Sequence, residues 1–205
     1  MDDRLIDCHT ELKRLRDLQY ESDFNDNIQQ SNFYKQKAEY IQNLIKKGVD
    51  SIPNFWLKNM PSVSNYYFGY GSNLSKDQMF VRCPESSYLT SGILSDYSWF
   101  INTRGYASIR QNLNDFVLGE IFKLSDKDIE LLDIYESVAE GMYEKFIMSV
   151  STLNGDIDCL VYVATDNENG QPQAEYIERI NHGIKSANLP SAYVQKSIRP
   201  FIPES

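Results

Sequence analysis

The sequence predicts a mixed α+β fold that is preceded by a long N-terminal helix. Residues 3–47 contain neither Gly nor Pro, and apolar residues recur there at every third or fourth position, as on one face of a helix. After Pro61 the pattern changes to short apolar or alternating runs separated by turn residues, which is typical of strands. Several of these strands follow one another without an intervening helix, so the second part predicts a curled sheet or a small barrel with helices around it.

The first 48 residues predict one amphipathic helix that ends at Gly48, with Lys46 and Lys47 placed to favour its negative end. A helix of about 45 residues spans on the order of 65 Å, at about 1.5 Å per residue. A domain formed by the rest of the chain is too small to cover that length, so two arrangements stay open: an extension packed on its own domain, or a dimerising coiled coil. We expect a helix at 1–48, a linker at 49–64 and a domain at 65–205.

The second part contains six predicted strands and three predicted helices. The strands are expected at 66–70, 92–101, 106–109, 116–123, 144–151 and 157–164, and the helices at 75–82, 125–136 and 175–187. Asn154-Gly155 predicts a hairpin turn between the last two strands. Ser125 is a suitable N-cap for the second helix, because its hydroxyl can accept a hydrogen bond from the first helical turn.

Composition argues against several classes of protein. The net charge of −9 would repel a nucleic-acid backbone. Three widely spaced cysteines (Cys8, Cys83 and Cys159) and only two histidines favour reduced thiols over disulfides or a zinc site. No secretory signal and no long apolar run is present, which predicts a cytoplasmic protein without membrane contact. The common nucleotide-binding and hydrolase motifs are also missing.

The segment Tyr67-Phe-Gly-Tyr-Gly-Ser-Asn-Leu74 predicts a strand that ends in a turn and leads into a helix. Backbone N–H groups in such a turn, together with the positive end of the helix, can bind a carboxylate or an oxyanion. Glycine in the turn lets the backbone approach a ligand closely. The alternative is a plain strand-to-helix connection without a ligand. The candidate binding residues are Tyr67, Phe68, Gly69, Tyr70, Gly71, Ser72 and Asn73.

Glu136 is the candidate acid or base. If a helix begins at Asp126, Leu132 faces the core and Glu136, one turn later, lies on the same side. Loss of hydration raises the pKa of a carboxyl group and suits it to proton transfer near neutral pH. The alternative is a helix-end acid that accepts a hydrogen bond from a nearby backbone N–H or from a tyrosine.

The two motifs together resemble the gamma-glutamyl cyclotransferases. The resemblance covers residues 66–202 and rests on the Tyr-Gly-Ser-Asn-Leu turn, followed about 60 residues later by Leu132-Asp-x-x-Glu136 and then Gly141-Met-Tyr143. It implies a small mixed β-barrel with surrounding helices that needs no metal and no organic cofactor. It also implies a reaction in which the α-amine of a gamma-glutamyl compound attacks its own γ-carbonyl and leaves 5-oxoproline.

The family resemblance assigns roles to particular residues. Glu136 matches the catalytic glutamate as general acid and base, while Tyr143 and Tyr176 match tyrosines that contact the substrate. Ser137 departs from the family, which commonly has Gly after the glutamate. The form of the turn favours gamma-glutamyl amino acids or dipeptides as substrates. The competing hypothesis is a catalytically silent scaffold that acts as an interaction protein through its N-terminal helix.

A second resemblance concerns the N-terminal part. Residues 33–42, followed by Ile52-Pro-Asn-Phe-Trp56, resemble the end of the dimerisation helix in the nucleosome-assembly and SET family of histone chaperones. This resemblance predicts helix pairing and a homodimer. The histone-binding core of that family does not follow in the sequence, which argues against histone binding.

Overall fold

The computed structural model describes residues 5–24, 28–53 and 65–204, and these fall into two compact units that divide between Val63 and Ser64. We describe each unit by itself. Neither contains a helix with the length and hydropathy that crossing a membrane requires, as far as the described residues go.

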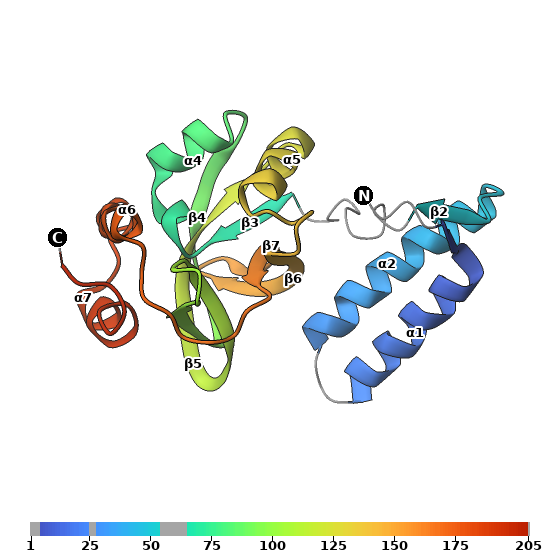
Figure 1. The fold of residues 1–205 in the computed structure, drawn as a ribbon, viewed down its shortest axis with the longest axis horizontal. Helices are drawn as coiled ribbons and strands as arrows, with labels where there is room; N and C mark the ends of the chain where they lie inside the picture. Colours follow the sequence, from blue (N-terminus) through green and yellow to red (C-terminus); the bar gives the residue numbers. More distant parts are fainter. Residues whose placement is uncertain (1–4, 25–27, 54–64, 205) are drawn as a thin grey trace. The chain divides into compact units, whose positions relative to one another are not determined.

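The first unit is a helical hairpin closed by a short β-ribbon (Figure 1). Its elements are β1 (Leu5–Asp7), α1 (Cys8–Phe24), α2 (Ile28–Lys46) and β2 (Ser51–Pro53). β1 pairs antiparallel with β2, and Ile6 lies opposite Ile52. The fully buried side chains at the centre come from both helices and from the ribbon: Cys8, Leu15, Ile41 and Ile52.

The expectation of one helix over 1–48 was therefore wrong. The segment forms two helices, and the first ends at Phe24. Residues 3–47 contain no Gly or Pro, but they include the weak helix formers Asp23, Asn25, Asp26 and Asn27, which are residue types that favour caps and turns. The apolar positions on α1 and α2 bury one another within the chain. The homodimer stays a prediction, and residues 54–56 of the chaperone-like segment lie outside the described residues.

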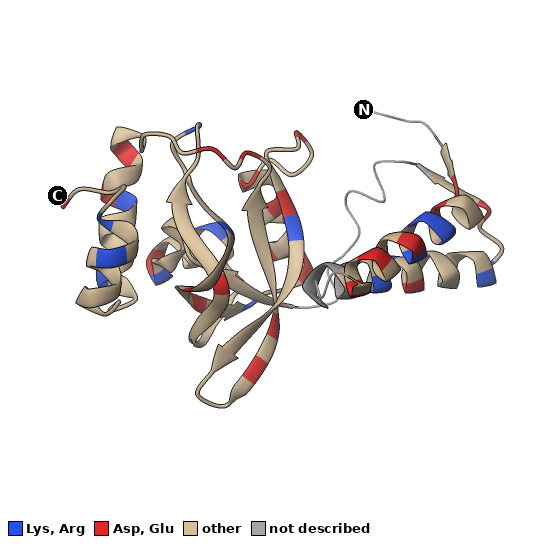
Figure 2. Cartoon of the chain, turned by 90° about the horizontal axis from the view of Figure 1, so that it is seen from below, with Lys and Arg blue, Asp and Glu red and all other residues tan. Residues whose placement is uncertain are grey.

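Charge is distributed evenly over this unit. Figure 2 shows acidic and basic residues interspersed along the two helices. Arg14 pairs with Glu11 one turn earlier, with 2.6 Å between the charged atoms. The first unit thus contributes little to the acidic excess of the chain.

The second unit is built on a closed barrel with the strand order β3-β5-β4-β6-β7. The strands are β3 (Tyr66–Gly69), β4 (Ser87–Ile101), β5 (Ala107–Lys123), β6 (Tyr143–Thr152) and β7 (Gly155–Ala164). Neighbours pair antiparallel except β3 and β7, which are parallel and close the barrel where Tyr67 lies opposite Leu160. This confirms the small mixed barrel.

Two details of the strands differ from the expectation. The runs 106–109 and 116–123 belong to one long strand, β5, whose pairing with β4 is interrupted by a bulge between Ser95 and Tyr97. Thr152 pairs with Gly155, so the hairpin turn consists of residues 153–154 and Gly155 follows it with a positive φ of 108°. A turn residue with positive φ is a position that glycine favours.

Helices flank the barrel on two sides (Figure 1). The helices α4 (Lys76–Arg82) and α5 (Asp126–Tyr135) contact each other, while α6 (Ala174–Ser186) packs against the short 3-10 helix η1 (Ser72–Leu74) that follows β3. The chain ends with α7 (Ser191–Tyr193) and one π-helical turn, η2 (Val194–Ile198), beside β4. This arrangement brings the ends of β3, α4, α5 and α6 to one region of the barrel.

Candidate active site

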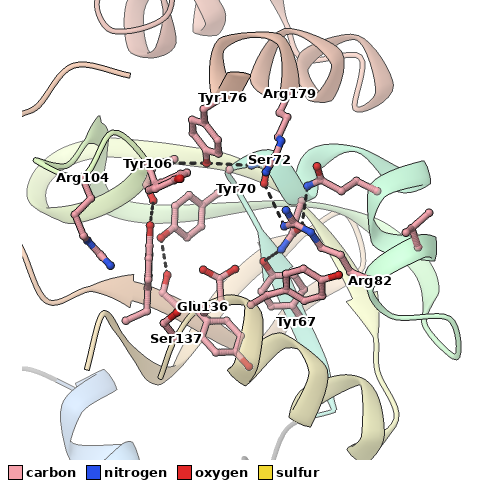
Figure 3. Close-up of a pocket in the computed structure, with 18 residues that line it drawn as sticks. Tyr67, Tyr70, Ser72, Arg82, Arg104, Tyr106, Glu136, Ser137, Tyr176 and Arg179 are labelled. Atoms are coloured by element: carbon pink, nitrogen blue, oxygen red, sulfur yellow. Dashed lines mark hydrogen bonds between the residues drawn. The ribbon is translucent and has the colours of Figure 1, made fainter. Parts of the chain in front are cut away.

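A pocket of about 560 Å³ opens where these elements meet (Figure 3). Its lining comes from the end of β3 and η1, from α4, from the turn between β4 and β5, from the end of α5, from β6 and β7, and from α6. Most of the side chains are tyrosines and arginines, with Glu136 as the acidic residue among the lining residues that the structure describes. Such a lining suits a polar, negatively charged ligand.

Glu136 is the C-cap of α5, and its carboxylate points into the pocket (Figure 3). Its N–H donates to the carbonyl of Leu132 at 2.8 Å, so the helical register holds until this residue. Within the described part of the chain, no hydrogen bond or ion pair reaches the carboxylate. Burial raises the pKa of Glu136 to about 7, while Arg82 and Arg104 act in the opposite direction through their charges. The alternative of a hydrogen-bonded helix-end acid is therefore not what the structure shows.

A sharp turn after Glu136 aims this carboxylate. Ser137 has a φ of +51°, its N–H donates to Ile134, and the N–H of Val138 donates to Asp133. This is the Schellman pattern of helix termination, in which the left-handed position usually carries glycine. Ser137 occupies that position despite its Cβ, which costs free energy in the folded state.

The end of α5 is also anchored to the barrel. Asp133 accepts hydrogen bonds from Lys145 on β6 and from the hydroxyl of Tyr162 on β7, each at 2.7 Å. Lys145 is almost completely buried, so this ion pair is well screened from water. Asp133 therefore fixes the helix that carries Glu136.

Tyr176 on α6 faces the turn between β3 and η1. Its hydroxyl oxygen accepts hydrogen bonds from the backbone N–H groups of Ser72 and Ala107, each at 3.3 Å. A phenol that accepts two hydrogen bonds keeps its own proton available for a ligand. A Cβ on Gly71 would lie 2.9 Å from this hydroxyl, so only glycine leaves the space that Tyr176 occupies.

A second network holds the opposite wall. The side-chain amide of Asn73 donates to the hydroxyl of Tyr67 at 2.8 Å and accepts from Arg82 at 2.7 Å. Arg82 also lies 3.3 Å from the hydroxyl of Ser72 and stacks on Tyr135. The buried Asn73 thereby orients one phenol and one guanidinium toward the pocket.

Four further residues that were predicted to bind the substrate do not offer a free hydroxyl to the pocket or do not line it. Tyr70 and Tyr143 line the pocket, but their hydroxyls donate to the carbonyls of Tyr162 and Ala107, at 2.5 and 2.9 Å. Phe68 and Gly69 do not line it. Phe68 is fully buried in the barrel core because alternate residues of a strand point to opposite faces.

Three arginines of the lining were not predicted from the sequence as site residues: Arg82, Arg104 and Arg179. Position along the chain was the available signal: Arg82 ends the predicted helix 75–82 that follows the Tyr-Gly-Ser-Asn-Leu turn, and Arg104 lies between two predicted strands. Arg179 is one turn after Glu175 and pairs with it at 2.8 Å. No group of three or more His, Cys, Asp or Glu side chains suited to a metal ion occurs within residues 5–24, 28–53 and 65–204.

Comparisons with known proteins agree with this architecture. Residues 116–196 match the model of the AIG2-like family. The chain is 32% identical to the human gamma-glutamylcyclotransferase over 141 residues, which are 63% of this chain and 75% of the human protein. It is 32% identical to the bovine gamma-glutamylcyclotransferase over 157 residues, or 70% of this chain and 84% of the bovine protein.

Solved structures show the same fold. A gamma-glutamyl cyclotransferase structure superposes with a TM-score of 0.61 at 29% identity, covering 68% of this chain and 89% of the other. YkqA from Bacillus subtilis superposes with a TM-score of 0.60 at 18% identity and covers 73% of this chain and 59% of YkqA, which supports the fold alone.

The strained turn predicts that Ser137→Gly stabilises the protein. Glycine removes the penalty for a Cβ at positive φ, while it increases the entropy of the unfolded chain, so we expect a net gain of about 0.5–1 kcal/mol. Ser137→Ala retains the Cβ and is the matched control, with no such gain expected. Urea unfolding of the three proteins measures the difference. Equal stability of the Gly and Ala variants would contradict this account of the turn.

The raised pKa of Glu136 predicts a pH-dependent cost to stability. Between the ordinary value of 4.5 and about 7 the unfolded state ionises first, so the free energy of unfolding falls as pH rises. Glu136→Gln removes this cost. We expect the free energy of unfolding of the variant to exceed that of the wild type by up to about 3 kcal/mol near pH 8 and to equal it near pH 4. Urea unfolding at both pH values tests this. A variant less stable than wild type near pH 8 would refute the prediction.

Proposed function

The chain belongs to the gamma-glutamylcyclotransferase family, and from this premise we propose that it converts a gamma-glutamyl amino acid or dipeptide to 5-oxoproline, with Glu136 as general acid and base. The observation that carries the proposal is the Glu136 carboxylate. It lies in the pocket without a partner among the described residues, and its pKa is raised to about 7. A group that titrates near neutral pH can both accept and return a proton under physiological conditions.

This reaction needs no nucleophile from the protein. The α-amine and the γ-carbonyl belong to the same substrate molecule, so the attack is intramolecular and proximity is built in. What the protein has to supply is a position for the substrate, a path for protons and stabilisation of the tetrahedral intermediate. The lining of the pocket offers groups for each of these tasks.

In the proposed reaction Glu136 carries protons from the attacking nitrogen to the departing nitrogen. The carboxylate takes a proton from the α-ammonium group, and the resulting amine attacks the γ-carbonyl carbon. The carboxylic acid then protonates the departing nitrogen as the bond between that nitrogen and the γ-carbon breaks. The new ring nitrogen loses its second proton by the same route, and the released amino acid leaves as an ammonium ion. Glu136 returns to its starting state.

Several groups around the turn after β3 can stabilise negative charge. Tyr176 already accepts two backbone hydrogen bonds, so its hydroxyl proton is free to donate to the oxyanion or to the α-carboxylate. Gly71 and Asn73 belong to the same turn, and their N–H groups donate to no side chain in the described part of the chain. The α-carboxylate at this turn would also lie beside the guanidinium of Arg82.

The competing hypothesis is a catalytically silent scaffold. It predicts no turnover of any gamma-glutamyl compound and a specific partner that is lost when residues 1–48 are deleted. The unpaired carboxylate of Glu136 favours the enzyme, since an ionisable group held in a pocket at a cost to folding is typical of an active site.

Loss of the acid and base is the direct test. We expect Glu136→Gln to lower 5-oxoproline release by about 10²–10⁴-fold, because the amide cannot accept a proton. The substrates are gamma-glutamyl-alanine, gamma-glutamyl-ε-lysine and glutathione. Glu140→Gln, an exposed acid in the loop after α5, is the matched control and should retain turnover. Wild-type turnover in Glu136→Gln would remove Glu136 from this role, and silence of the wild type on all three substrates would favour the scaffold.

The same residue predicts the pH profile. Only the ionised carboxylate can begin the reaction, so kcat/KM should rise with pH and reach half of its plateau near the Glu136 pKa of about 7. Arg82 holds this pKa down, and Arg82→Gln should therefore move the acid limb to higher pH. Initial rates measured between about pH 5 and pH 9 test both statements. An acid limb of the kcat/KM profile with its half-maximum near pH 4.5, as for a hydrated glutamate, would contradict them.

A further inference from the structure

The positive charge of the pocket is divided between two sides of Glu136. In Figure 3, Arg82 and Arg104 lie on opposite sides of the Glu136 carboxylate, and both charges act on its pKa. Arg179, the third arginine, is paired with Glu175. Neither Arg82 nor Arg104 forms an ion pair within the described residues. The pocket thus offers two separated cations without a carboxylate partner.

Arg104 is held in place from several directions. One terminal nitrogen donates to the carbonyl of Met142 at 2.8 Å, and the guanidinium stacks on the ring of Tyr143 at 5.0 Å from its centroid. The backbone N–H of Arg104 donates to the side chain of Asn102, and the backbone carbonyl of Arg104 accepts from the side chain of Gln173. A guanidinium has five N–H donors, so this arrangement fixes the group and leaves most of its donors for a ligand.

The proposed substrate has a matching distribution of charge. A gamma-glutamyl amino acid carries the α-carboxylate of its glutamyl part and, beyond the bond that breaks, the carboxylate of the amino acid that departs. In the proposed function the glutamyl α-carboxylate binds at the turn of Ser72 and Asn73, on the side of Arg82. With the reacting carbon beside Glu136, the departing amino acid extends away from that turn, toward Arg104.

We propose that Arg104 binds the carboxylate of the departing amino acid and thereby selects single gamma-glutamyl amino acids over gamma-glutamyl amines. This inference rests on the proposed function and assigns the part of the pocket that recognises the departing group. A carboxylate bound by a guanidinium forms paired, charge-assisted hydrogen bonds. The charge of Arg104 also acts on Asp166, but that carboxylate is partly exposed and is hydrogen-bonded to Thr103.

Two substrates that differ by one carboxylate isolate this contact. Gamma-glutamyl-alanine and gamma-glutamyl-ethylamide share the glutamyl part, the breaking bond and the two-carbon departing chain, and only the first has the second carboxylate. We expect the wild type to prefer gamma-glutamyl-alanine in kcat/KM by roughly 10- to 100-fold, the size of a charged hydrogen-bonded contact. In Arg104→Gln the preference should fall to near unity, and Arg104→Lys should retain part of it.

The ratio of the two substrates also corrects for an indirect effect. Removing Arg104 raises the pKa of Glu136, which affects both substrates equally and cancels in the ratio; rates at about pH 8.5 reduce it further. Arg110→Gln is the matched control, because Arg110 lies on β5 outside the pocket lining and binds Asn167 and Asn169. It should keep the wild-type preference.

The outcomes separate the two proposals. A preference that collapses in Arg104→Gln and persists in Arg110→Gln supports the assignment. Equal use of both substrates by the wild type overturns it, as does a preference that survives in Arg104→Gln or collapses in Arg179→Gln instead. If Arg104→Gln does not fold, Arg104→Lys is the deciding variant, because lysine lacks the planar pair of N–H donors of arginine. A substrate preference in Arg104→Lys equal to that of the wild type would overturn bidentate recognition by Arg104. If the wild type releases 5-oxoproline from neither substrate, the proposed function itself fails and this inference falls with it.

Discussion

The chemistry of the pocket depends on a carboxylate that is half-buried and has no hydrogen-bond or ion-pair partner among the described residues. Glu136 stands at the end of α5, and burial raises the pKa of its side chain to about 7. Without Arg82 and Arg104 the pKa would rise further and the group would stay protonated at neutral pH. The two guanidinium groups are close enough to moderate this pKa, yet neither forms an ion pair with Glu136 that would make it an inert structural acid.

The Glu136 carboxylate stays directed into the pocket only if the residues around it are held rigidly, because it could otherwise turn toward a hydrogen-bond donor of the protein. Three devices provide them: the helix cap of Ser125 and Asp128 at the start of α5, the ion pair of Asp133 with Lys145, and the Schellman turn at its end. On the facing side, Tyr176 joins α6 to the turn after β3 and to the start of β5 through two hydrogen bonds. The elements of the barrel are thus tied together at the same groups that face the ligand.

Local pattern was sufficient for much of this arrangement. Alternation and turn residues located all the barrel strands, and helical periodicity placed Glu136 on the inner side of α5. Features that depend on distant contacts were not predictable. No local signal shows that Tyr143 donates its hydroxyl proton to Ala107, or that Asn73 positions Arg82. The N-terminal helix was misjudged because its apolar stripe continues across a polar interruption, and only packing between the two halves shows that the chain reverses there.

If the substrate binds as proposed, the same arginines serve two purposes, because their effect on Glu136 changes when the substrate binds. In the free pocket their charges lower the pKa of Glu136 and keep a useful fraction of it ionised. A bound substrate brings carboxylates to the arginines, which neutralises much of that influence, and its entry also displaces water from the pocket. In the proposed mechanism, both effects raise the affinity of Glu136 for a proton at the step in which it takes one from the α-ammonium group. Under this proposal the positive charge that attracts the substrate is neutralised by the bound carboxylates, and Glu136 becomes a stronger base once the substrate is in place.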